Sequence, residues 1–340
     1  MDLVEQLGPL RFPLTFAAAL VLSLYFTPVI RRGAIRYGVV DAPDGKLKVH
    51  DQPVAYLGGM AIYLSFLFAL AFTHEFDERV LGLLLAASII VMLGLFDDLK
   101  VLTPGAKLAG QAVATAVLIK AGIMIRLSFL PDEVALILTF LWLLGTTNAI
   151  NLIDVSDALA GGVALVASAF LFVVASWNGH TALAVLSLAL MGSTLGFLVF
   201  NRPPASIYLG DTGSMFLGFM LGALAMTNHY TFVHPWAALA PVLILGVPVF
   251  DTLFVMGVRL YRGLPVMQGS PDHFAVRLRR HGYASGTIAA LGMGATTALG
   301  SAALAVCVSP APVAGAVLAA AFCGAVAVAV VLLRMGRGGR

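Results

Sequence analysis

Residues 80–98 read VLGLLLAASIIVMLGLFDD, an almost unbroken apolar run that ends at two adjacent acids, Asp97 and Asp98. A helix needs about 20 predominantly apolar residues to cross a bilayer, and this run lacks the strand-like alternation of apolar and polar residues. The stretch therefore predicts a membrane-spanning helix with two carboxylates at its end.

The rest of the chain has the same character. Of its 340 residues, 60% are hydrophobic and only 11% are charged, whereas soluble domains carry about 25% charged residues. A water-soluble globule of this size could not bury so much apolar surface, so the composition predicts an integral membrane protein. The basic residues form no long tract and the net charge is only +3, which argues against nucleic-acid binding.

Ten further apolar runs lie along the sequence. They fall near residues 12–30, 57–73, 108–125, 134–147, 161–177, 181–200, 213–228, 235–258, 286–308 and 312–333. Together with the first run they predict an all-α fold, a polytopic membrane bundle of about 11 transmembrane helices. The longest polar insertions, about 31–56 and 259–285, are too short for a soluble domain, so we expect residues 1–340 to form a single membrane domain.

Lysine and arginine residues are shared unevenly between the predicted loops. Most of the 20 follow the first, third, seventh, ninth and eleventh spans, which leaves Arg11, Arg79, Lys120 and Arg126 for the other face. Cytoplasmic loops carry an excess of Lys and Arg. This bias predicts a cytoplasmic C-terminus and an external N-terminus.

Three polar clusters interrupt the apolar pattern. They are Gly94-Leu-Phe-Asp97-Asp98-Leu-Lys100, Asn148-Ala-Ile-Asn151-Leu-Ile-Asp154-Val-Ser-Asp157-Ala-Leu-Ala-Gly161-Gly162 and Tyr208-Leu-Gly210-Asp211-Thr212-Gly213-Ser214. A carboxylate at the bilayer centre costs roughly 2.5–3.5 kcal/mol, so acids within apolar sequence indicate function. The predicted topology brings all three clusters to the cytoplasmic side, where we expect their five carboxylates to line one cavity.

Carboxylates gathered in this way need a compensating cation. Asp154 and Asp157 are three residues apart, so on a helix they share a face and repel, as the adjacent acids Asp97 and Asp98 also do. Mg²⁺ prefers oxygen ligands and commonly binds through one or two carboxylates plus substrate phosphates. Asp211 stands at a predicted helix start, where backbone N–H groups favour an anion. The pattern indicates a divalent metal that carries a phosphorylated ligand.

Further motifs extend this pattern towards both ends of the chain. Val40-Asp41-Ala42-Pro43, Lys48-Val49-His50 and Pro53 precede Leu57-Gly58-Gly59, Lys107 follows the aspartate pair, and Gly246-Val-Pro248-Val-Phe-Asp251-Thr252 lies in the ninth span. With these motifs the chain resembles the polyprenyl-phosphate N-acetylhexosamine-1-phosphate transferases over about residues 38–285. Its predicted eleven spans are closer to the branch that transfers N-acetylglucosamine 1-phosphate than to the muramyl-pentapeptide branch.

The resemblance implies an enzyme of the bacterial cytoplasmic (inner) membrane with its active site on the cytoplasmic side. A polyprenyl (undecaprenyl) phosphate in the bilayer would attack the β-phosphorus of a UDP-N-acetylhexosamine, giving polyprenyl diphosphate-sugar and UMP for envelope polysaccharide synthesis. The resemblance also allows a homodimer. It implies Mg²⁺, with Mn²⁺ as an alternative, held by Asp211 and Asp98.

The same resemblance assigns roles to individual residues. Asp97, Asp98 and Asp211 would be catalytic, with Asp97 receiving or orienting the proton of the lipid phosphate. The substrate-binding residues would be Lys48, His50, Lys107, Asn151, Asp154, Asp157, His273 and Arg277.

Some positions depart from the family pattern. Val155 and Ala158 replace the glycines of the DGxDGLA motif, and Tyr56 replaces an arginine before Leu-Gly-Gly. In the HxHHRL-type motif only His273 remains of the three histidines, because Ala275 and Val276 stand at the other two positions. These changes affect the expected sugar specificity and leave the five carboxylates intact.

Two other functions fit parts of the pattern. Many spans with embedded acids also describe an ion-coupled secondary transporter, although such carriers place their sites near the bilayer midplane and often show repeats. The altered histidine motif would suit an inactive paralogue that scaffolds glycan assembly. Turnover of a UDP-sugar would separate the enzyme from both.

Overall fold

The computed structural model describes residues 7–41, 54–100, 102–127, 129–265 and 270–335. Its helices are η1 (Gly8–Leu10), α2 (Arg11–Arg36), α3 (Gly58–Thr73), α4 (Glu78–Leu99), α5 (Pro104–Lys120), α6 (Asp132–Ile153), α7 (Leu159–Trp177), α8 (Thr181–Asn201), α9 (Gly210–Thr227), η2 (Pro235–Leu239), α10 (Ala240–Ile244), α11 (Gly246–Tyr261), α12 (Phe274–Arg280), α13 (Ser285–Val308) and α14 (Ala311–Met335). The strands are β1 (Val40–Asp41) and β2 (Val54–Ala55).

The predicted all-α, polytopic membrane architecture is confirmed. Every one of the eleven predicted apolar runs contains a helix, and α2, α4, α6, α7, α8, α13 and α14 are long and apolar enough to cross a membrane. The η2–α10 and α11 helices meet at 80° and add at most one bent span, which gives up to eight among the described residues. The count of eleven is not confirmed, because α3 and α5 have only 16 and 17 residues and α9 begins with the polar sequence GDTGS.

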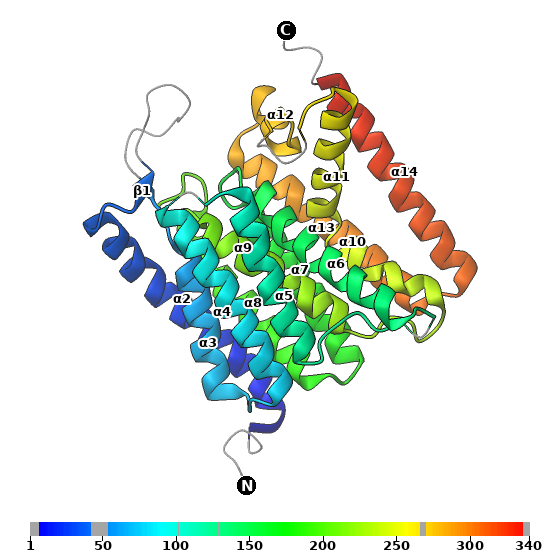
Figure 1. Cartoon of the computed structure of the whole chain (residues 1–340), viewed down its shortest axis with the longest axis horizontal. Helices are drawn as coiled ribbons and strands as arrows, with labels where there is room; N and C mark the ends of the chain where they lie inside the picture. The colour runs from blue at the N-terminus through cyan, green and yellow to red at the C-terminus, as the bar shows by residue number, and fades with distance from the viewer. Residues whose placement is uncertain (1–6, 42–53, 101, 128, 266–269, 336–340) are drawn as a thin grey trace.

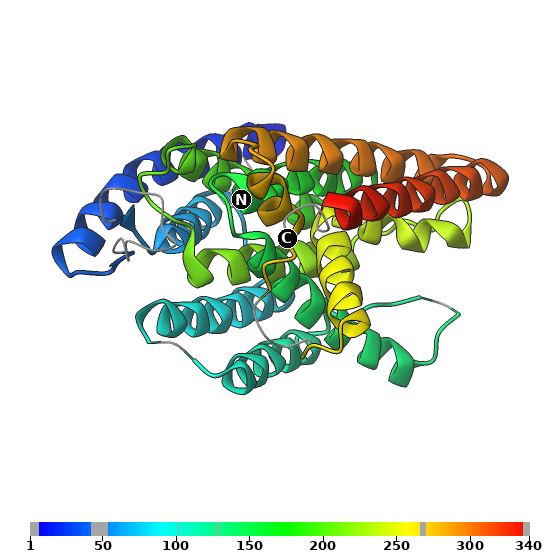
Figure 2. The ribbon, with the colours of Figure 1, turned by 90° about the horizontal axis from the view of Figure 1, so that it is seen from above.

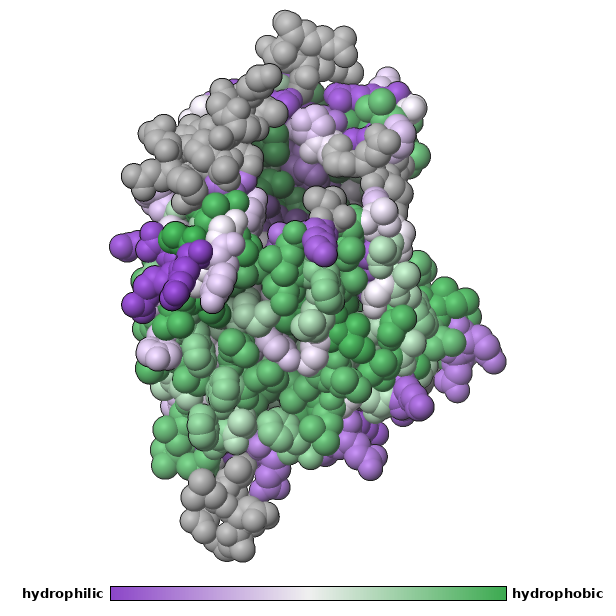
Figure 3. Space-filling view, turned by 60° about the vertical axis from the view of Figure 1, so that its left-hand side comes forward, coloured by the Kyte–Doolittle hydropathy of each residue, from purple (hydrophilic) through white to green (hydrophobic). Residues whose placement is uncertain are grey.

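The surface separates into an apolar band and two hydrophilic ends. Figure 3 shows hydrophobic side chains around the middle of the molecule and hydrophilic side chains above and below them. In Figure 1 the chain enters α2 at the lower end, while α14 finishes at the upper end beside α11 and α12. This arrangement is what a bilayer around the middle of the bundle requires.

Helix α9 runs through the interior of the bundle, and nearly all of its residues are buried. Its first turn lies against α3 and α4 at contacts that only glycine allows. A Cβ atom on Gly59 would lie 2.0 Å from the backbone nitrogen of Gly213, and one on Gly94 would lie 2.5 Å from the Cα atom of Thr212. Small residues let membrane helices approach backbone to backbone, so these contacts fix the start of α9 beside the end of α4.

The last two helices lie at the periphery. In Figure 2 α13 and α14 follow one edge of the molecule, while α4 and α5 lie at the opposite edge. Most of the α14 side chains are exposed, and few residues of this helix are buried against the rest of the chain. An apolar helix with so little protein contact suits a lipid environment.

A small β-structure lies at the upper end of the bundle. Strands β1 and β2 pair antiparallel, with Val40 opposite Ala55 and Asp41 opposite Val54. The N–H of Tyr208 donates to the Ala55 carbonyl at 2.8 Å, which ties β2 to the segment that precedes α9. These strands were not predicted from the sequence, and their pairing brings three distant segments to one place.

Candidate active site

A cavity of about 1080 Å³ opens at the upper end of the bundle, where α4 and α6 end and where α9 and α13 begin. Its wall contains all five carboxylates of the three polar clusters together with Lys107 and Asn151. The lining residues are Asp41, Tyr56, Asp97, Asp98, Leu102, Lys107, Asn151, Asp154, Val155, Ser156, Asp157, Asn201, Pro204, Tyr208, Leu209, Gly210, Asp211, Arg279, Tyr283, Ala284 and Ser285. The predicted convergence of the clusters on one cavity is therefore confirmed.

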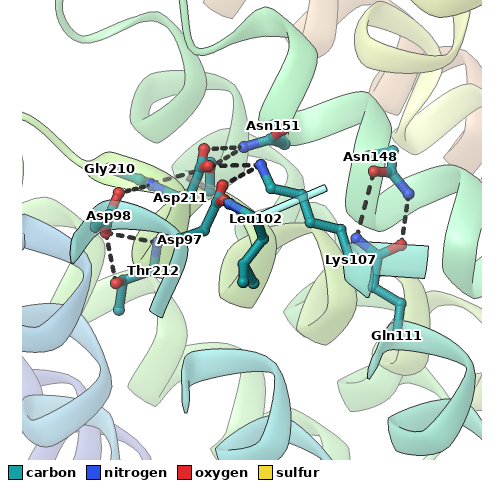
Figure 4. A network of polar contacts seen from close by, with 11 residues as sticks. Asp97, Asp98, Leu102, Lys107, Gln111, Asn148, Asn151, Gly210, Asp211 and Thr212 are labelled. Atoms are coloured by element: carbon teal, nitrogen blue, oxygen red, sulfur yellow. Dashed lines mark hydrogen bonds and ion pairs between the residues drawn. The ribbon is translucent and has the colours of Figure 1, made fainter. Parts of the chain in front are cut away.

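Lys107 joins two of the carboxylates at one wall of this cavity. Its ammonium group contacts Asp97 Oδ2 and donates a hydrogen bond to Asp211 Oδ2 at 2.7 Å, as Figure 4 shows. The other oxygen of Asp97 accepts the backbone N–H of Leu102 at 2.6 Å. One cation thus lies between two acids that are more than a hundred residues apart in the sequence.

Asn151 completes the surroundings of Asp211. Its Nδ2 atom donates to Asp211 Oδ1 at 2.6 Å and lies 2.8 Å from Ser214 Oγ (Figure 4). Asp211 therefore receives hydrogen bonds from α5 and α6 while it stands on the first turn of α9. Both of its oxygens are oriented by neighbours before any ligand arrives.

Asp98 points to the start of α9. Its Oδ1 atom accepts the N–H of Asp211 at 2.7 Å, and its Oδ2 atom accepts the N–H and the hydroxyl of Thr212 at 3.0 and 2.6 Å. These N–H groups belong to the first turn of a helix, where no intrahelical acceptor exists. Gly210 has a φ of +73°, and a Cβ atom there would lie 2.7 Å from Asp98 Oδ2. Glycine is therefore needed for this carboxylate to approach the backbone.

A pair of amides lies one helical turn from Lys107 and Asn151, behind the residues that line the cavity. Asn148 Nδ2 donates to Gln111 Oε1 at 2.7 Å, and Gln111 Nε2 donates back to Asn148 Oδ1 at 3.3 Å (Figure 4). Gln111 is four residues after Lys107 and Asn148 is three residues before Asn151. The reciprocal pair therefore holds α5 and α6 in the register that the site requires.

The turn between α6 and α7 forms another part of the cavity wall. Burial, and then repulsion from the neighbouring carboxylates, raises the pKa of Asp154 to about 8. Asp157 Oδ2 accepts the N–H of Ala205 at 3.2 Å, and the buried Ser156 Oγ has no hydrogen-bond partner in the described part of the chain. The turn therefore presents an uncompensated carboxyl group and an unpaired hydroxyl at the cavity.

Ala158 stands at one of the positions where the chain departs from the family motif. It occupies the position of a glycine and keeps a glycine-like conformation, with φ 60° and ψ 0°. Its N–H donates to Asn201 Oδ1 at 2.9 Å, and Asn201 Nδ2 donates to the Ile207 carbonyl at 2.9 Å. These contacts hold the turn in a left-handed conformation that an L-residue adopts at a cost.

His273 and Arg277 do not line the cavity. His273 is 4% exposed, and its Nδ1 atom lies 2.6 Å from Asp251 Oδ2. Arg277 is 3% exposed and donates to Asp272 Oδ1 and to the Leu332 carbonyl, each at 2.6 Å. The substrate-binding roles predicted for these two residues remain predictions, since in this structure they fasten α12 to α11 and α14. Lys48 and His50 lie outside the described residues.

Several cavity residues were not among the predicted site residues. The rings of Tyr56 and Tyr208 lie with their centroids 5.8 Å apart, while Asn201 holds the 154–158 turn and Arg279 reaches the same turn from α12. Asn201 is a polar residue at the end of an apolar run, which was the available signal. Arg279 stands among several basic residues whose presence is already explained by the excess of Lys and Arg expected in cytoplasmic loops. The sequence therefore offered no reason to choose it.

Comparison with known proteins gives the family. The model of glycosyl transferase family 4 matches residues 80–229, a segment that runs from α4 to α9. A Bacillus subtilis protein described as a probable undecaprenyl-phosphate N-acetylglucosaminyl 1-phosphate transferase is 34% identical over 282 residues, which cover 80% of this chain and 78% of that protein. The chain belongs to glycosyl transferase family 4.

Two other relatives of this family 4 glycosyl transferase span its two main branches. A decaprenyl-phosphate N-acetylglucosaminephosphotransferase of Mycolicibacterium smegmatis is 30% identical over 314 residues, 81% of this chain and 77% of that protein. A phospho-N-acetylmuramoyl-pentapeptide-transferase of Shouchella clausii is 33% identical over 269 residues, 72% of this chain and 79% of that protein. The family 4 transferase is thus a phosphotransferase enzyme, and its resemblance to the N-acetylglucosamine-phosphate branch is confirmed.

Proposed function

We propose that this enzyme transfers a sugar 1-phosphate from a UDP-N-acetylhexosamine, N-acetylglucosamine being the first candidate, to a membrane polyprenyl phosphate. The observation that carries the proposal is the convergence of Asp97, Lys107, Asn151 and Asp211 from four helices on one cavity wall. The names of the relatives support the polyprenyl phosphate acceptor and the sugar phosphate. They give no support to a transporter or to a scaffold without activity.

The reaction requires in-line displacement at phosphorus. An oxygen of the lipid phosphate attacks the β-phosphorus of the donor, the bond from this phosphorus to the bridging oxygen breaks, and UMP leaves with the bond electrons. Such transfers depend on positioning and charge neutralisation more than on covalent help from the protein. Asp97, held by Leu102 and Lys107, is placed to orient the lipid phosphate.

The donor set at Asp211 suits Mg²⁺. In the described part of the chain no three His, Cys, Asp or Glu side chains form a metal cluster. However, one oxygen each of Asp97 and Asp211 faces the same cationic centre, the Lys107 ammonium. Mg²⁺ commonly binds through one or two carboxylates plus substrate phosphates, so two protein ligands suffice when the diphosphate supplies the others.

We assign the metal to Asp211 with Asp97. Asp98, which the sequence predicts as the second ligand, has both oxygens bonded to backbone N–H groups of the first turn of α9, and it positions Asp211. Asp97 and Asp211 differ in that each has one oxygen whose partner is the Lys107 ammonium, a cation that a metal could replace. When bound, Mg²⁺ supplies charge neutralisation on the diphosphate and stabilisation of the leaving UMP; Mn²⁺ offers the same oxygen chemistry. Lys107 then attracts phosphate oxygens as a point charge.

The nucleotide would occupy the opposite part of the cavity, against the 154–158 turn. Tyr56 and Tyr208 offer aromatic faces there, and base–aromatic stacking is a sequence-tolerant source of affinity. Asn151, Asp154 and Asp157 offer oxygen and amide groups to ribose and sugar hydroxyls. Lys48 and His50 keep their predicted substrate-binding roles, and a homodimer remains part of the proposal.

We further propose eleven crossings of the bacterial inner membrane, with the N-terminus outside and the cavity on the cytoplasmic side. The cavity end carries the β1–β2 pair, α12 and the end of α14, and it contains the Arg-rich loops (Figure 1). Single-cysteine labelling in oriented vesicles tests this. A cysteine at Lys100 should react only from the cytoplasm and one at Asn178 only from outside; labelling from one side at both positions would contradict the topology.

The activity is tested with purified protein, undecaprenyl phosphate, Mg²⁺ and a panel of radiolabelled UDP-sugars. We expect lipid-linked product with at least one UDP-N-acetylhexosamine, with release of UMP. Asp132→Asn, an exposed change at the far end of α6, is the matched control for Asp211→Asn, which should abolish product. Absence of product with every donor would refute the proposal.

A further inference from the structure

The cavity has an imbalance of charge that Lys107 does not remove. Its wall contains six aspartates, at positions 41, 97, 98, 154, 157 and 211, and two strong cations, Lys107 and Arg279. The Lys107 ammonium is already shared by two carboxylates. A substrate with a diphosphate therefore needs further positive charge, and Arg279 is the side chain of the described wall that can supply it.

Arg279 is paired with no carboxylate among the described residues. Its Nη2 atom donates to the Val155 carbonyl at 2.9 Å, and the side chain is otherwise exposed at the cavity. A guanidinium carries five N–H donors in a planar fork that matches phosphate oxygens. One donor anchors the group to the 154–158 turn and the others remain available to a ligand.

The position of Arg279 is fixed by neighbouring residues whose side chains point away from the cavity. Arg277 on the same short helix, and His273 directly before it, are buried against Asp251, Asp272 and the Leu332 carbonyl. Arg262 adds a second cation on Asp272, at 3.1 Å. These contacts hold α12 so that Arg279, two residues after Arg277, emerges into the cavity.

Arg279 also lies within electrostatic range of the tyrosine pair. Burial, followed by the charges of Asp157 and Asp41, raises the pKa of Tyr208 to about 12, and the charge of Arg279 opposes this rise. The guanidinium thus lies beside the 154–158 turn and close enough to Tyr208 to affect its charge.

We propose that Arg279 binds the diphosphate of the donor nucleotide and that His273 and Arg277 are positioning residues that present it. This inference rests on the proposed function. It assigns the substrate contact to Arg279, which the motif does not include, and not to His273 and Arg277, which the motif suggests.

The test measures binding separately from turnover. Calorimetry with uridine, UMP and UDP, in the presence of Mg²⁺ and without lipid acceptor, is run on the wild type, Arg279→Gln, Arg279→Lys and Arg280→Gln. Arg280 is the matched control, because it is the exposed neighbour on α12 and does not line the cavity. We expect Arg279→Gln to weaken UDP binding at least tenfold and uridine binding less than twofold, with Arg279→Lys in between and Arg280→Gln unchanged.

Other results would overturn the inference. Equal weakening of uridine and UDP would show that Arg279 acts only through the Val155 carbonyl, and unchanged UDP affinity would exclude a phosphate contact. Failure of the wild type to bind UDP would overturn it as well. The proposed function fails by a different measurement, the absence of lipid-linked product, so a wild type that binds UDP but makes no product separates the two.

Discussion

Replacing Lys107 by methionine removes the cation that, among the described residues, Asp97 and Asp211 share, while keeping most of the length of the side chain. The Asp97 and Asp211 oxygens that contact one ammonium lie at most about 5 Å apart, and at an effective dielectric constant of about 20 two unit charges at this distance repel by about 3 kcal/mol. We therefore expect Lys107→Met, without divalent cations, to lower the free energy of unfolding by about 3 kcal/mol and the melting temperature by roughly 5 °C.

Added Mg²⁺ should reverse this loss, because a divalent cation can replace the missing ammonium between the two carboxylates. Binding to the native state stabilises it in proportion to the logarithm of the metal concentration above the dissociation constant. In the wild type the metal has to displace Lys107 first. The concentration of Mg²⁺ for half-maximal stabilisation should therefore be lower in Lys107→Met than in the wild type.

The assay is thermal unfolding in detergent, followed by intrinsic fluorescence, in EDTA and in a Mg²⁺ titration. Lys100→Met is the control, because Lys100 is exposed after the end of α4 and does not line the cavity. The reasoning is refuted if Lys107→Met melts like the wild type in EDTA, or if Mg²⁺ stabilises both proteins to the same extent at the same concentrations.

Four further substitutions follow from the structure. Asp97→Asn and Asp211→Asn should each lower turnover at least ~100-fold in folded protein, near the effect of losing one major electrostatic contact; rates within tenfold of the wild type would exclude the assigned roles. Gly59→Ala should prevent folding, because its Cβ would lie 2.0 Å from the Gly213 nitrogen, whereas Gly33→Ala meets nothing within 4 Å; detergent-extracted yield and melting temperature distinguish the two. Ala158→Gly should stabilise the protein by about 1 kcal/mol, since glycine adopts a φ of 60° without the steric cost of a Cβ; a lower melting temperature would contradict this.

The sequence predicted the structure best where a residue type is compatible with only one kind of environment. Continuous apolar runs predicted helices at every position where the structure has a long one. Acids cannot be scattered through a bilayer at low cost, so Asp97, Asp154 and Asp211 had to meet on one side. Both predictions depend on local composition and on alternation of the spans, which need no knowledge of packing.

Side-chain direction could not be predicted in the same way. The seven residues of α12 are basic and apolar in a mixed order, and which of them face inward depends on Asp251 of α11 and Leu332 of α14. The motif favoured His273 and Arg277 as substrate contacts, whereas Arg279 reaches the cavity. Similarly, β1 and β2 have two residues each, and their place is set by the distant Tyr208.

The close contact of α9 with α3 and α4 fixes the part of the cavity around Asp211. Around Asp211 the backbones of three helices touch, so that region can neither widen nor shift without separating the bundle. The cavity wall also contains the long side chains of Tyr56, Tyr208 and Arg279, which can change rotamer or be exchanged individually. Redesign of donor preference should therefore leave the glycine contacts untouched and vary these three side chains.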